Sequence, residues 1–328
     1  MAFKISKALI ISMVTMLSIF IGFTALTANG EIFSTMMESD SEADPASSKV
    51  LESPQTREGH SPRENSEETS QATEEAASSA FHETKIRDFD LSQGTADFLP
   101  VLMYHHLLPA ADNIYPEEPA VLNLETFEQQ MAYLAGHGFT ALTLKEAELF
   151  LRGELEIPQN SVLITFDDGY ASEAVYAAEV LRRYDMQAAS FLITSLIEDE
   201  TQAFHPHELS YLSWEQIEES RDVFEYAHHS HDMHHLEGEK SLLVKSCEDT
   251  LREDLRSSHS VLESPYFAYP FGHKDCGVIE TLQDKDYRMA FSTQEEMARP
   301  GDDLFRIGRF GITYHVSFSQ FQSIVHGL

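Results

Sequence analysis

Short apolar runs alternate with amphipathic segments from about Phe98 to Leu328, and this alternation constrains the fold more than any other feature. Repeated strand–helix units predict a parallel sheet or an α/β barrel, and about 230 residues suit one barrel. An open doubly wound sheet is the alternative architecture. Strands are expected at 99–104, 162–166, 187–194, 223–227, 266–269, 289–292 and 305–312. Helices are expected at 124–136, 143–151, 171–184, 240–258, 278–284 and 318–325, with a further helix starting at Ser213.

Residues 1–30 differ in composition from the rest of the chain. Lys4 and Lys7 precede an apolar run that extends from Ala8 to about Ala28, which is the pattern of an export signal. A run of about 20 apolar residues is also long enough to cross a bilayer, so a retained anchor is equally compatible with this segment. We expect an exported protein that acts at the cell surface or outside the cell. Its membrane contact is expected through this segment only.

Residues 31–97 are rich in Glu, Ser, Thr, Ala and Gln and poor in aromatic residues. Such a segment buries too little apolar surface to offset the entropy of ordering, so it predicts a disordered acidic linker before a domain at 98–328. The chain has 55 acidic and 22 basic residues, a net charge of -33, which argues against a nucleic-acid partner. Cys247 and Cys276 either pair in an oxidising compartment or remain free thiols.

One predicted strand ends in two adjacent carboxylates, Asp167 and Asp168, which are followed by Gly169. Glycine permits a sharp turn there, so the two side chains can serve different tasks at one site, one binding a metal ion and the other acting as a base. An Asp-Asp-Gly sequence is also typical of a solvated turn, because Asp and Gly are common turn residues. The other polar clusters decide between these two interpretations.

Polar clusters follow four of the predicted strands, each directly after the strand ends. In barrels and open parallel sheets, functional residues gather at the carboxyl ends of the strands, so these four clusters indicate one pocket. No Gly-rich phosphate-binding fingerprint follows any strand, which weakens a nucleotide-binding interpretation. The clusters are His105/His106, Asp167/Asp168, His228–His235 and Pro270–Gly272.

The histidine-rich run offers two pairs of metal ligands. His231 and His235 are four residues apart and would share a helix face, whereas His229 and His234 form the other pair. One carboxylate and two imidazoles make a three-ligand site with open positions, which a hydrolytic metal ion uses to activate water. Zn²⁺ is the default ion for these ligand types. Histidine runs also bind metal loosely without any catalytic role.

Four segments resemble the polysaccharide deacetylase family, which is the NodB-homology, carbohydrate esterase family 4 type, and in particular its exported poly-N-acetylglucosamine deacetylase branch. The resemblance covers roughly residues 98–328. It implies a distorted (β/α) barrel with fewer than eight strands. It also implies a metal-dependent hydrolase that removes N-acetyl groups from an extracellular amino-sugar polymer. The segments are Val101–His106, Thr165–Tyr170, His229–His234 and Ala268–Gly272.

The resemblance also implies roles for individual residues. Asp168, His229 and His234 would bind a divalent ion, with Zn²⁺ the default, and Asp167 would be the base. The backbone N–H of Phe271 would stabilise the oxyanion of the tetrahedral intermediate.

Two further groups complete the expected site. Tyr269 and His105 would lie on the substrate side of the pocket. Arg309 would orient Asp167 through an ion pair, which would also keep that carboxylate ionised.

Three features depart from the family pattern. The two ligand histidines are five rather than four residues apart, which leaves His231 and His235 open as the alternative pair. Phe271 stands where many members carry a residue with a polar side chain, so only the backbone donor remains. The late histidine that acts as general acid has no clear match; His315 lies in the expected part of the chain, and His105 is a second candidate. A non-catalytic metal- or glycan-binding module at the cell surface is therefore the alternative function.

Overall fold

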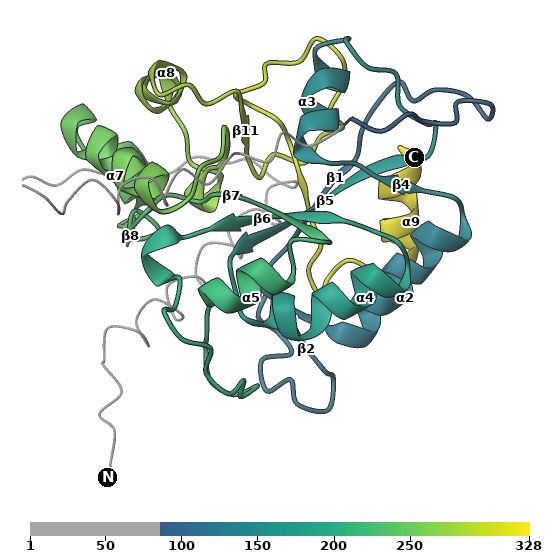
Figure 1. The fold of residues 1–328 in the computed structure, drawn as a ribbon, viewed down its shortest axis with the longest axis horizontal. Helices are drawn as coiled ribbons and strands as arrows, with labels where there is room; N and C mark the ends of the chain where they lie inside the picture. Colours follow the sequence, from purple (N-terminus) through teal and green to yellow (C-terminus); the bar gives the residue numbers. More distant parts are fainter. Residues whose placement is uncertain (1–85) are drawn as a thin grey trace, which may run out of the picture. The chain divides into compact units, whose positions relative to one another are not determined.

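The computed structural model describes residues 86–328, so the predictions for 1–30 and for most of the linker lie outside the described residues. An eight-stranded parallel sheet forms the centre of this region, in the order β11-β10-β7-β6-β5-β1-β12, with β4 paired to the start of β5 (Figure 1). The expected distorted (β/α) barrel is confirmed; seven strands form its continuous order, and the two-residue strand β4 brings the sheet to eight strands rather than the expected fewer than eight. The strands are β1 (Val101–Tyr104), β4 (Thr140–Ala141), β5 (Ser161–Asp168), β6 (Ala188–Leu192), β7 (Phe224–His228), β10 (Tyr266–Ala268), β11 (Met289–Phe291) and β12 (Phe310–Gly311).

The segment 307–311 joins the two ends of this strand order. Ile307 forms a parallel bridge with Phe291 of β11, and Phe310–Gly311 pairs with β1 on the other side. Within a few residues, the backbone of this segment therefore pairs first with the strand at one edge of the sheet and then with the strand at the other. This explains why only two residues of the expected strand 305–312 form a regular ladder with β1. Arg309 lies at the crossing point.

Alternation along the strands separates an outer and an inner layer. On β5, Val162, Ile164 and Phe166 point to the helices and belong to the largest apolar cluster, which includes side chains of α2, α4 and α5. The inner face of β5 carries Leu163, then Thr165, then Asp167. Leu163 packs in the second apolar cluster with residues such as Phe191 and Phe291. The inner face thus changes from apolar to polar toward the carboxyl end of the strand.

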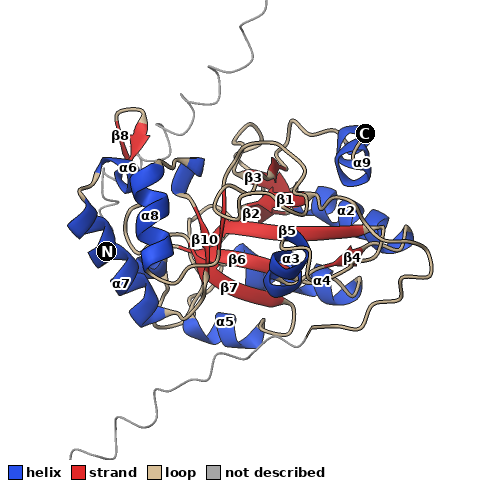
Figure 2. Cartoon of the chain, turned by 90° about the horizontal axis from the view of Figure 1, so that it is seen from above, coloured by secondary structure: helices blue, strands red, loops and turns tan. Residues whose placement is uncertain are grey.

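Helices surround the sheet, as Figure 2 shows from above, and a third apolar cluster lies beneath α7 and α8. Capping boxes begin α3 at Thr143 and α5 at Ser213, where a side-chain oxygen accepts the N3 amide and fixes the first turn. The helices are α2 (Leu124–Gly136), α3 (Leu144–Leu151), α4 (Ala178–Arg183), α5 (Trp214–Glu219), α6 (Leu242–Lys245), α7 (Glu248–Val261), α8 (Cys276–Asp284) and α9 (Phe318–His326). Shorter elements are the π-helix η2 (Glu173–Ala177) and the 3-10 helices η3 (Thr194–Leu196) and η4 (Pro270–Gly272).

Two of the expected helices differ in detail. The segment 171–184 contains η2 followed by α4, so its first turn is a π-helix. The segment 240–258 is split into α6 and α7, because Ser246 and Cys247 between them have extended backbone angles. Serine and cysteine are weak helix formers, which permits a break at this point. Both cysteine thiols are free and exposed.

Two small strand pairs had no clear signal in the sequence. They are β2 (His106–Leu108) with β3 (Val121–Asn123), which is parallel, and β8 (Leu236–Glu237) with β9 (Lys240–Ser241), which is antiparallel. Strands of two or three residues are too short for an alternating pattern to identify them.

The last residues of the expected linker, 86–97, are bound to the domain. Arg87 forms an ion pair with the fully buried Glu146 at 2.5 Å, and the amide of Ala96 donates to the carbonyl of Ile157 at 3.0 Å. Residues 86–97 therefore pack with the domain rather than forming part of a separate linker. A single arginine in a Glu-rich stretch does not indicate this packing in the sequence. Within residues 86–328, no helix has both the length and the apolar character needed to cross a membrane.

Candidate metal centre and active site

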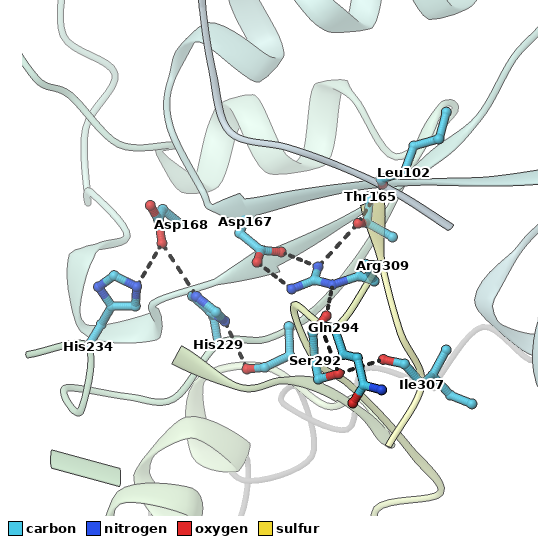
Figure 3. A network of polar contacts seen from close by, with 11 residues as sticks. Leu102, Thr165, Asp167, Asp168, His229, His234, Ser292, Gln294, Ile307 and Arg309 are labelled. Atoms are coloured by element: carbon cyan, nitrogen blue, oxygen red, sulfur yellow. Dashed lines mark hydrogen bonds and ion pairs between the residues drawn. The ribbon is translucent and has the colours of Figure 1, made fainter. Parts of the chain in front are cut away.

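Asp168, His229 and His234 converge at the carboxyl end of the sheet (Figure 3). Asp168 is the last residue of β5, and His229 directly follows β7. The Nε2 atom of His234 lies 3.3 Å from Asp168 Oδ1, and that of His229 lies 3.5 Å from the same oxygen. One potential ligand atom from each residue lies within 4.8 Å of the others. The structure therefore brings together the three residues that were expected to share one site.

These three side chains fit a divalent metal ion. Both carboxylate oxygens of Asp168 are buried, and neither makes a hydrogen bond of normal geometry to another described residue. Nδ1 of His229 lies 2.8 Å from the carbonyl of Ala268, so Nδ1 carries the proton and Nε2 is left free to bind a metal. A buried carboxylate without donors is costly unless a cation neutralises it. The donor set of two nitrogens and one oxygen is one that Zn²⁺ binds readily.

The alternative histidine pair lies apart from the carboxylates. Nδ1 of His231 makes a hydrogen bond of 2.9 Å with Thr194 Oγ1, and His235 faces Asp232 at 3.5 Å on an exposed part of the loop. Within the described residues, Asp168 with His229 and His234 is the one group that could hold a metal ion. The His231/His235 pairing is therefore not supported.

The side chain of Asp167 lies on the inner face of β5 and contacts Arg309, which is fully buried. Two nitrogens of the guanidinium lie 2.6 Å from the two carboxylate oxygens, a bidentate ion pair. Burial by itself raises the pKa of Asp167, but the charges of Arg309 and His229 outweigh it and lower that pKa below its ordinary value. The carboxylate is therefore ionised and fixed in orientation. The expected ion pair with Arg309 is present.

Thr165 and Ser292 hold Arg309 in place. The guanidinium donates to Thr165 Oγ1 at 3.2 Å and to the carbonyl of Ser292 at 3.0 Å. Sequence reasoning missed both residues. A signal for Thr165 does exist: it is a polar residue in an apolar strand, two positions before Asp167 and therefore on the same face.

Strained backbone gathers at this site. Asp168 has φ 80°, Ser230 has φ 72° and Phe271 has φ 58°, all in the left-handed region that non-glycine residues seldom adopt. Such residues cost about 1–3 kcal/mol each and persist where the surroundings over-determine them. Asp168 ends β5, whereas Ser230 and Phe271 belong to the segments after β7 and β10. Three of the five non-glycine residues with positive φ within residues 86–328 thus lie at this site, and the other two, Asp185 and Asp286, lie in the turns after α4 and α8.

The turn after β10 contains Phe271 and Gly272, and Gly272 has no space for a side chain. The ring of Phe271 stacks on the imidazole of His234, with 4.3 Å between ring centroids. The sequence did not indicate this packing, since only the backbone N–H of Phe271 was expected to contribute to the site. That N–H makes no hydrogen bond to another described residue, so it remains available as a donor. Gly272 has φ 70°, and a Cβ at this position would collide with the side chain of Thr293.

Tyr269 does not face the pocket, which corrects the expectation for its side chain. It is fully buried, and its hydroxyl donates to the carbonyl of Phe305 at 2.9 Å. Neighbouring residues of a strand point to opposite sides of the sheet, and Tyr269 lies in the apolar cluster beneath α7 and α8.

The two candidate general acids lie in different surroundings. His105 directly follows β1, at the carboxyl end of the sheet where β5 ends in Asp168, and its charge is among those that lower the pKa of Asp167 and of Asp168. His315 is exposed, and its ring lies against Tyr314 with 3.9 Å between centroids. No hydrogen bond or ion pair within residues 86–328 joins His315 to Asp167 or Asp168.

Comparison with known proteins agrees with this arrangement. The family model for polysaccharide deacetylase matches residues 155–290. Two relatives are named poly-beta-1,6-N-acetyl-D-glucosamine N-deacetylase. The one from Staphylococcus aureus (strain MRSA252) is 30% identical over 198 residues, which are 57% of this chain and 66% of the relative. The one from Staphylococcus epidermidis is 30% identical over 196 residues, 56% of this chain and 65% of the relative. The chain thus spans just under two thirds of each relative's length.

Solved structures share the fold. The structure of IcaB from Ammonifex degensii has a TM-score of 0.60 and 28% sequence identity, and the match covers 71% of this chain and 98% of that one. The Streptococcus pyogenes deacetylase PplD, in complex with acetate, has a TM-score of 0.59 at 22% identity, with 70% and 99% of the two chains covered. The matched sequence segment at residues 155–290, the shared barrel and the residues at its carboxyl end agree in their similarity to polysaccharide deacetylases.

Proposed function

We propose that this protein is a metal-dependent N-deacetylase that removes acetyl groups from an extracellular amino-sugar polymer. The supporting observation is the pairing of two adjacent carboxylates in different environments. Asp168 lies between two imidazoles and makes no hydrogen bond of normal geometry to another described residue, whereas Asp167 is held by Arg309 through two hydrogen bonds. Environments that separate two neighbouring carboxylates in this way allow one to serve as a ligand and the other as a base.

Asp168, His229 and His234 would hold the ion, and we propose Zn²⁺ from their ligand types. When bound, a divalent ion supplies Lewis-acid chemistry, polarising the acetamide carbonyl and making water a stronger nucleophile at neutral pH. The stacked ring of Phe271 restrains the imidazole of His234, and the carbonyl of Ala268 restrains that of His229. These contacts keep the two rings oriented before an ion binds.

The remaining residues would carry the proton transfers. The carboxylate of Asp167 takes a proton from the attacking water while Arg309 keeps it oriented. The free N–H of Phe271 donates to the oxyanion that forms on the acetamide carbonyl. His105 then protonates the leaving nitrogen, the C–N bond breaks, and acetate and a free amine are released. His105 is preferred to His315 for this step because it directly follows β1 at the carboxyl end of the sheet and its charge acts on both carboxylates, whereas His315 is exposed.

The substrate we propose is a poly-N-acetylglucosamine. The support is the name of the two staphylococcal relatives, poly-beta-1,6-N-acetyl-D-glucosamine N-deacetylase. We also propose that the protein acts outside the cytoplasm, on the grounds of the basic and apolar pattern of residues 1–30.

Acetate release from β-1,6-linked N-acetylglucosamine oligomers tests the function, with β-1,4-linked oligomers as a comparison. Loss of a general base lowers rates by about 10²–10⁴-fold, so Asp167→Asn should fall in that range. Asp249→Asn removes a carboxylate from the exposed side of α7 and should leave the rate unchanged. Full activity of Asp167→Asn would exclude it as the base. Absence of acetate release by the zinc-loaded wild type from both series would favour a binding module instead.

A further inference from the structure

The segment 230–233 connects the two ligand imidazoles and has an unusual backbone. It lies between His229 and His234, so its conformation sets where the second imidazole lies relative to the first. Ser230 is fully buried and has φ 72°. A non-glycine residue in this conformation persists only where neighbouring groups hold it. The hydrogen bonds of the segment show which groups do so.

Asp254 of α7 binds two successive amides of this segment. Its carboxylate oxygens accept from the backbone N–H of His231 at 2.9 Å and from that of Asp232 at 2.8 Å. Hydrogen bonds to an ionised acceptor are about twice as strong as neutral ones. Asp254 is 8% exposed, so water competes little for these bonds.

The opposite side of the segment is held by neutral hydrogen bonds. The amide of Thr194 donates to the carbonyl of Ser230 at 3.1 Å, and the amide of Ser195 donates to the carbonyl of His231 at 3.1 Å. Ser230 Oγ accepts from the amide of Met233 at 3.2 Å within the segment. The segment is therefore fixed between η3 on one side and the carboxylate of Asp254 on the other.

Asp254 has no ion pair with a cationic side chain within residues 86–328. Removing a carboxylate from water without a cation costs free energy, so α7 would be more stable with a neutral residue at this position. The carboxylate of Asp254 instead accepts hydrogen bonds from two backbone amides of the loop, those of His231 and Asp232. This pattern is expected of a residue retained for the geometry of the loop rather than for the stability of the helix.

We propose that Asp254 is a positioning residue for the metal centre, which fixes the loop between His229 and His234 so that both imidazoles face Asp168 before an ion binds. The proposal rests on the metal centre of the proposed function, but not on the identity of the substrate. It assigns to α7 a part in metal binding, although no residue of α7 is a ligand.

The affinity for Zn²⁺, measured by competition with a chromophoric chelator, tests the proposal. Asp254→Asn keeps the size of the side chain but replaces one acceptor oxygen with a donor group, so one loop amide loses its partner. Loss of such a supporting contact weakens metal binding by about 10–100-fold, and we expect an effect in this range. Asp249→Asn on the exposed side of the same helix removes the same charge and should bind Zn²⁺ like the wild type. Asp254→Ser, which keeps one acceptor, serves as a second variant.

Two further measurements separate positioning from a general loss of stability. The free energy of unfolding of the metal-free variant should fall by less than its free energy of Zn²⁺ binding does, and saturating Zn²⁺ should restore acetate release. Wild-type Zn²⁺ affinity in folded Asp254→Asn and Asp254→Ser would overturn the proposal. So would a loss of affinity matched by an equal loss of metal-free stability. If the wild type binds Zn²⁺ tightly but releases no acetate, the proposed function fails while the role of Asp254 stands.

Discussion

Asp167 and Arg309 form a buried ion pair whose two members depend on one another. Both are almost completely excluded from solvent, and the bidentate geometry satisfies both oxygens of the carboxylate. A buried pair of this kind contributes little net stability compared with apolar residues, but the loss of one partner leaves an uncompensated charge. The pair therefore fixes the orientation of the base more than it stabilises the fold.

Replacing Arg309 with methionine should lower the free energy of unfolding by about 3–5 kcal/mol, because Asp167 is left buried without a cation. Urea denaturation measures the change. Arg306→Met is the matched control, since Arg306 pairs with Asp303 on an exposed surface. This substitution should change the free energy of unfolding by less than about 0.5 kcal/mol. Equal stability of the two variants would contradict the structural description of this pair.

Glu173 is a second buried carboxyl group, and its pKa is shifted in the opposite direction to that of Asp167. Its two oxygens are buried without hydrogen-bond partners of normal geometry within the described residues. Burial raises the pKa of Glu173 well above its ordinary value of 4.5, and the nearby charge of Asp168 adds to the shift. The side chain is therefore neutral in the folded protein at a pH where the unfolded chain is already ionised. Its contribution to stability is complete below pH 4.5 and is lost as the pH rises toward the folded pKa.

Glu173→Gln should remove this pH dependence. Relative to the wild type, the variant should gain up to about 1.4 kcal/mol of unfolding free energy per pH unit between pH 5 and pH 7. Denaturation curves at several pH values measure the difference. Glu280→Gln, an exposed position on α8, should show a constant difference from the wild type. A constant difference for Glu173→Gln as well would mean that the carboxyl group is ionised in the folded state.

Individual elements were predictable where periodicity and capping residues act locally. The bounds of α2 are those expected from apolar spacing, and the capping boxes at Thr143 and Ser213 begin helices as expected. The partition of Asp167 and Asp168 into different environments follows from their place at a strand end. These features depend on residues a few positions apart in the sequence.

Other elements depend on contacts between distant parts of the chain, which a local pattern does not contain. The attachment of 86–97 rests on Arg87 meeting Glu146, 59 residues further along. The stacking of Phe271 on His234 and the bonds from Asp254 to the histidine loop likewise join separate elements. The burial of Tyr269 follows from which side of β10 faces the helices, and its sequence motif did not indicate that side.

The turn after β10 requires glycine for two separable reasons. Gly272 and Gly238 both have left-handed φ, at 70° and 68°, but a Cβ has open space only at Gly238. Gly238→Ala should therefore cost only the conformational penalty of about 1–2 kcal/mol. Gly272→Ala should cost more and should also lower acetate release, because relief of the clash with Thr293 displaces Phe271. Urea denaturation and the acetate assay measure both effects, and equal costs at the two glycines would contradict this explanation.

The site as a whole exists only because the sheet closes. His105, His229 and Phe271 follow the strands β1, β7 and β10, and Asp167 and Asp168 end β5. Arg309 binds Asp167 from the segment that joins the two edges of the sheet. Over the described residues, the parallel order of the strands brings these segments to one end of the barrel. The role of each side chain in the proposed reaction then depends on a single divalent ion at the centre of the group.

An anomalous difference map, recorded at the zinc absorption edge from crystals grown with Zn²⁺, would locate that ion. We expect one peak at about 2.0–2.2 Å from a carboxylate oxygen of Asp168 and from Nε2 of His229 and His234. A peak on His231 and His235, or no ordered peak at saturating Zn²⁺, would contradict the assignment of the metal centre and with it the hydrolytic mechanism.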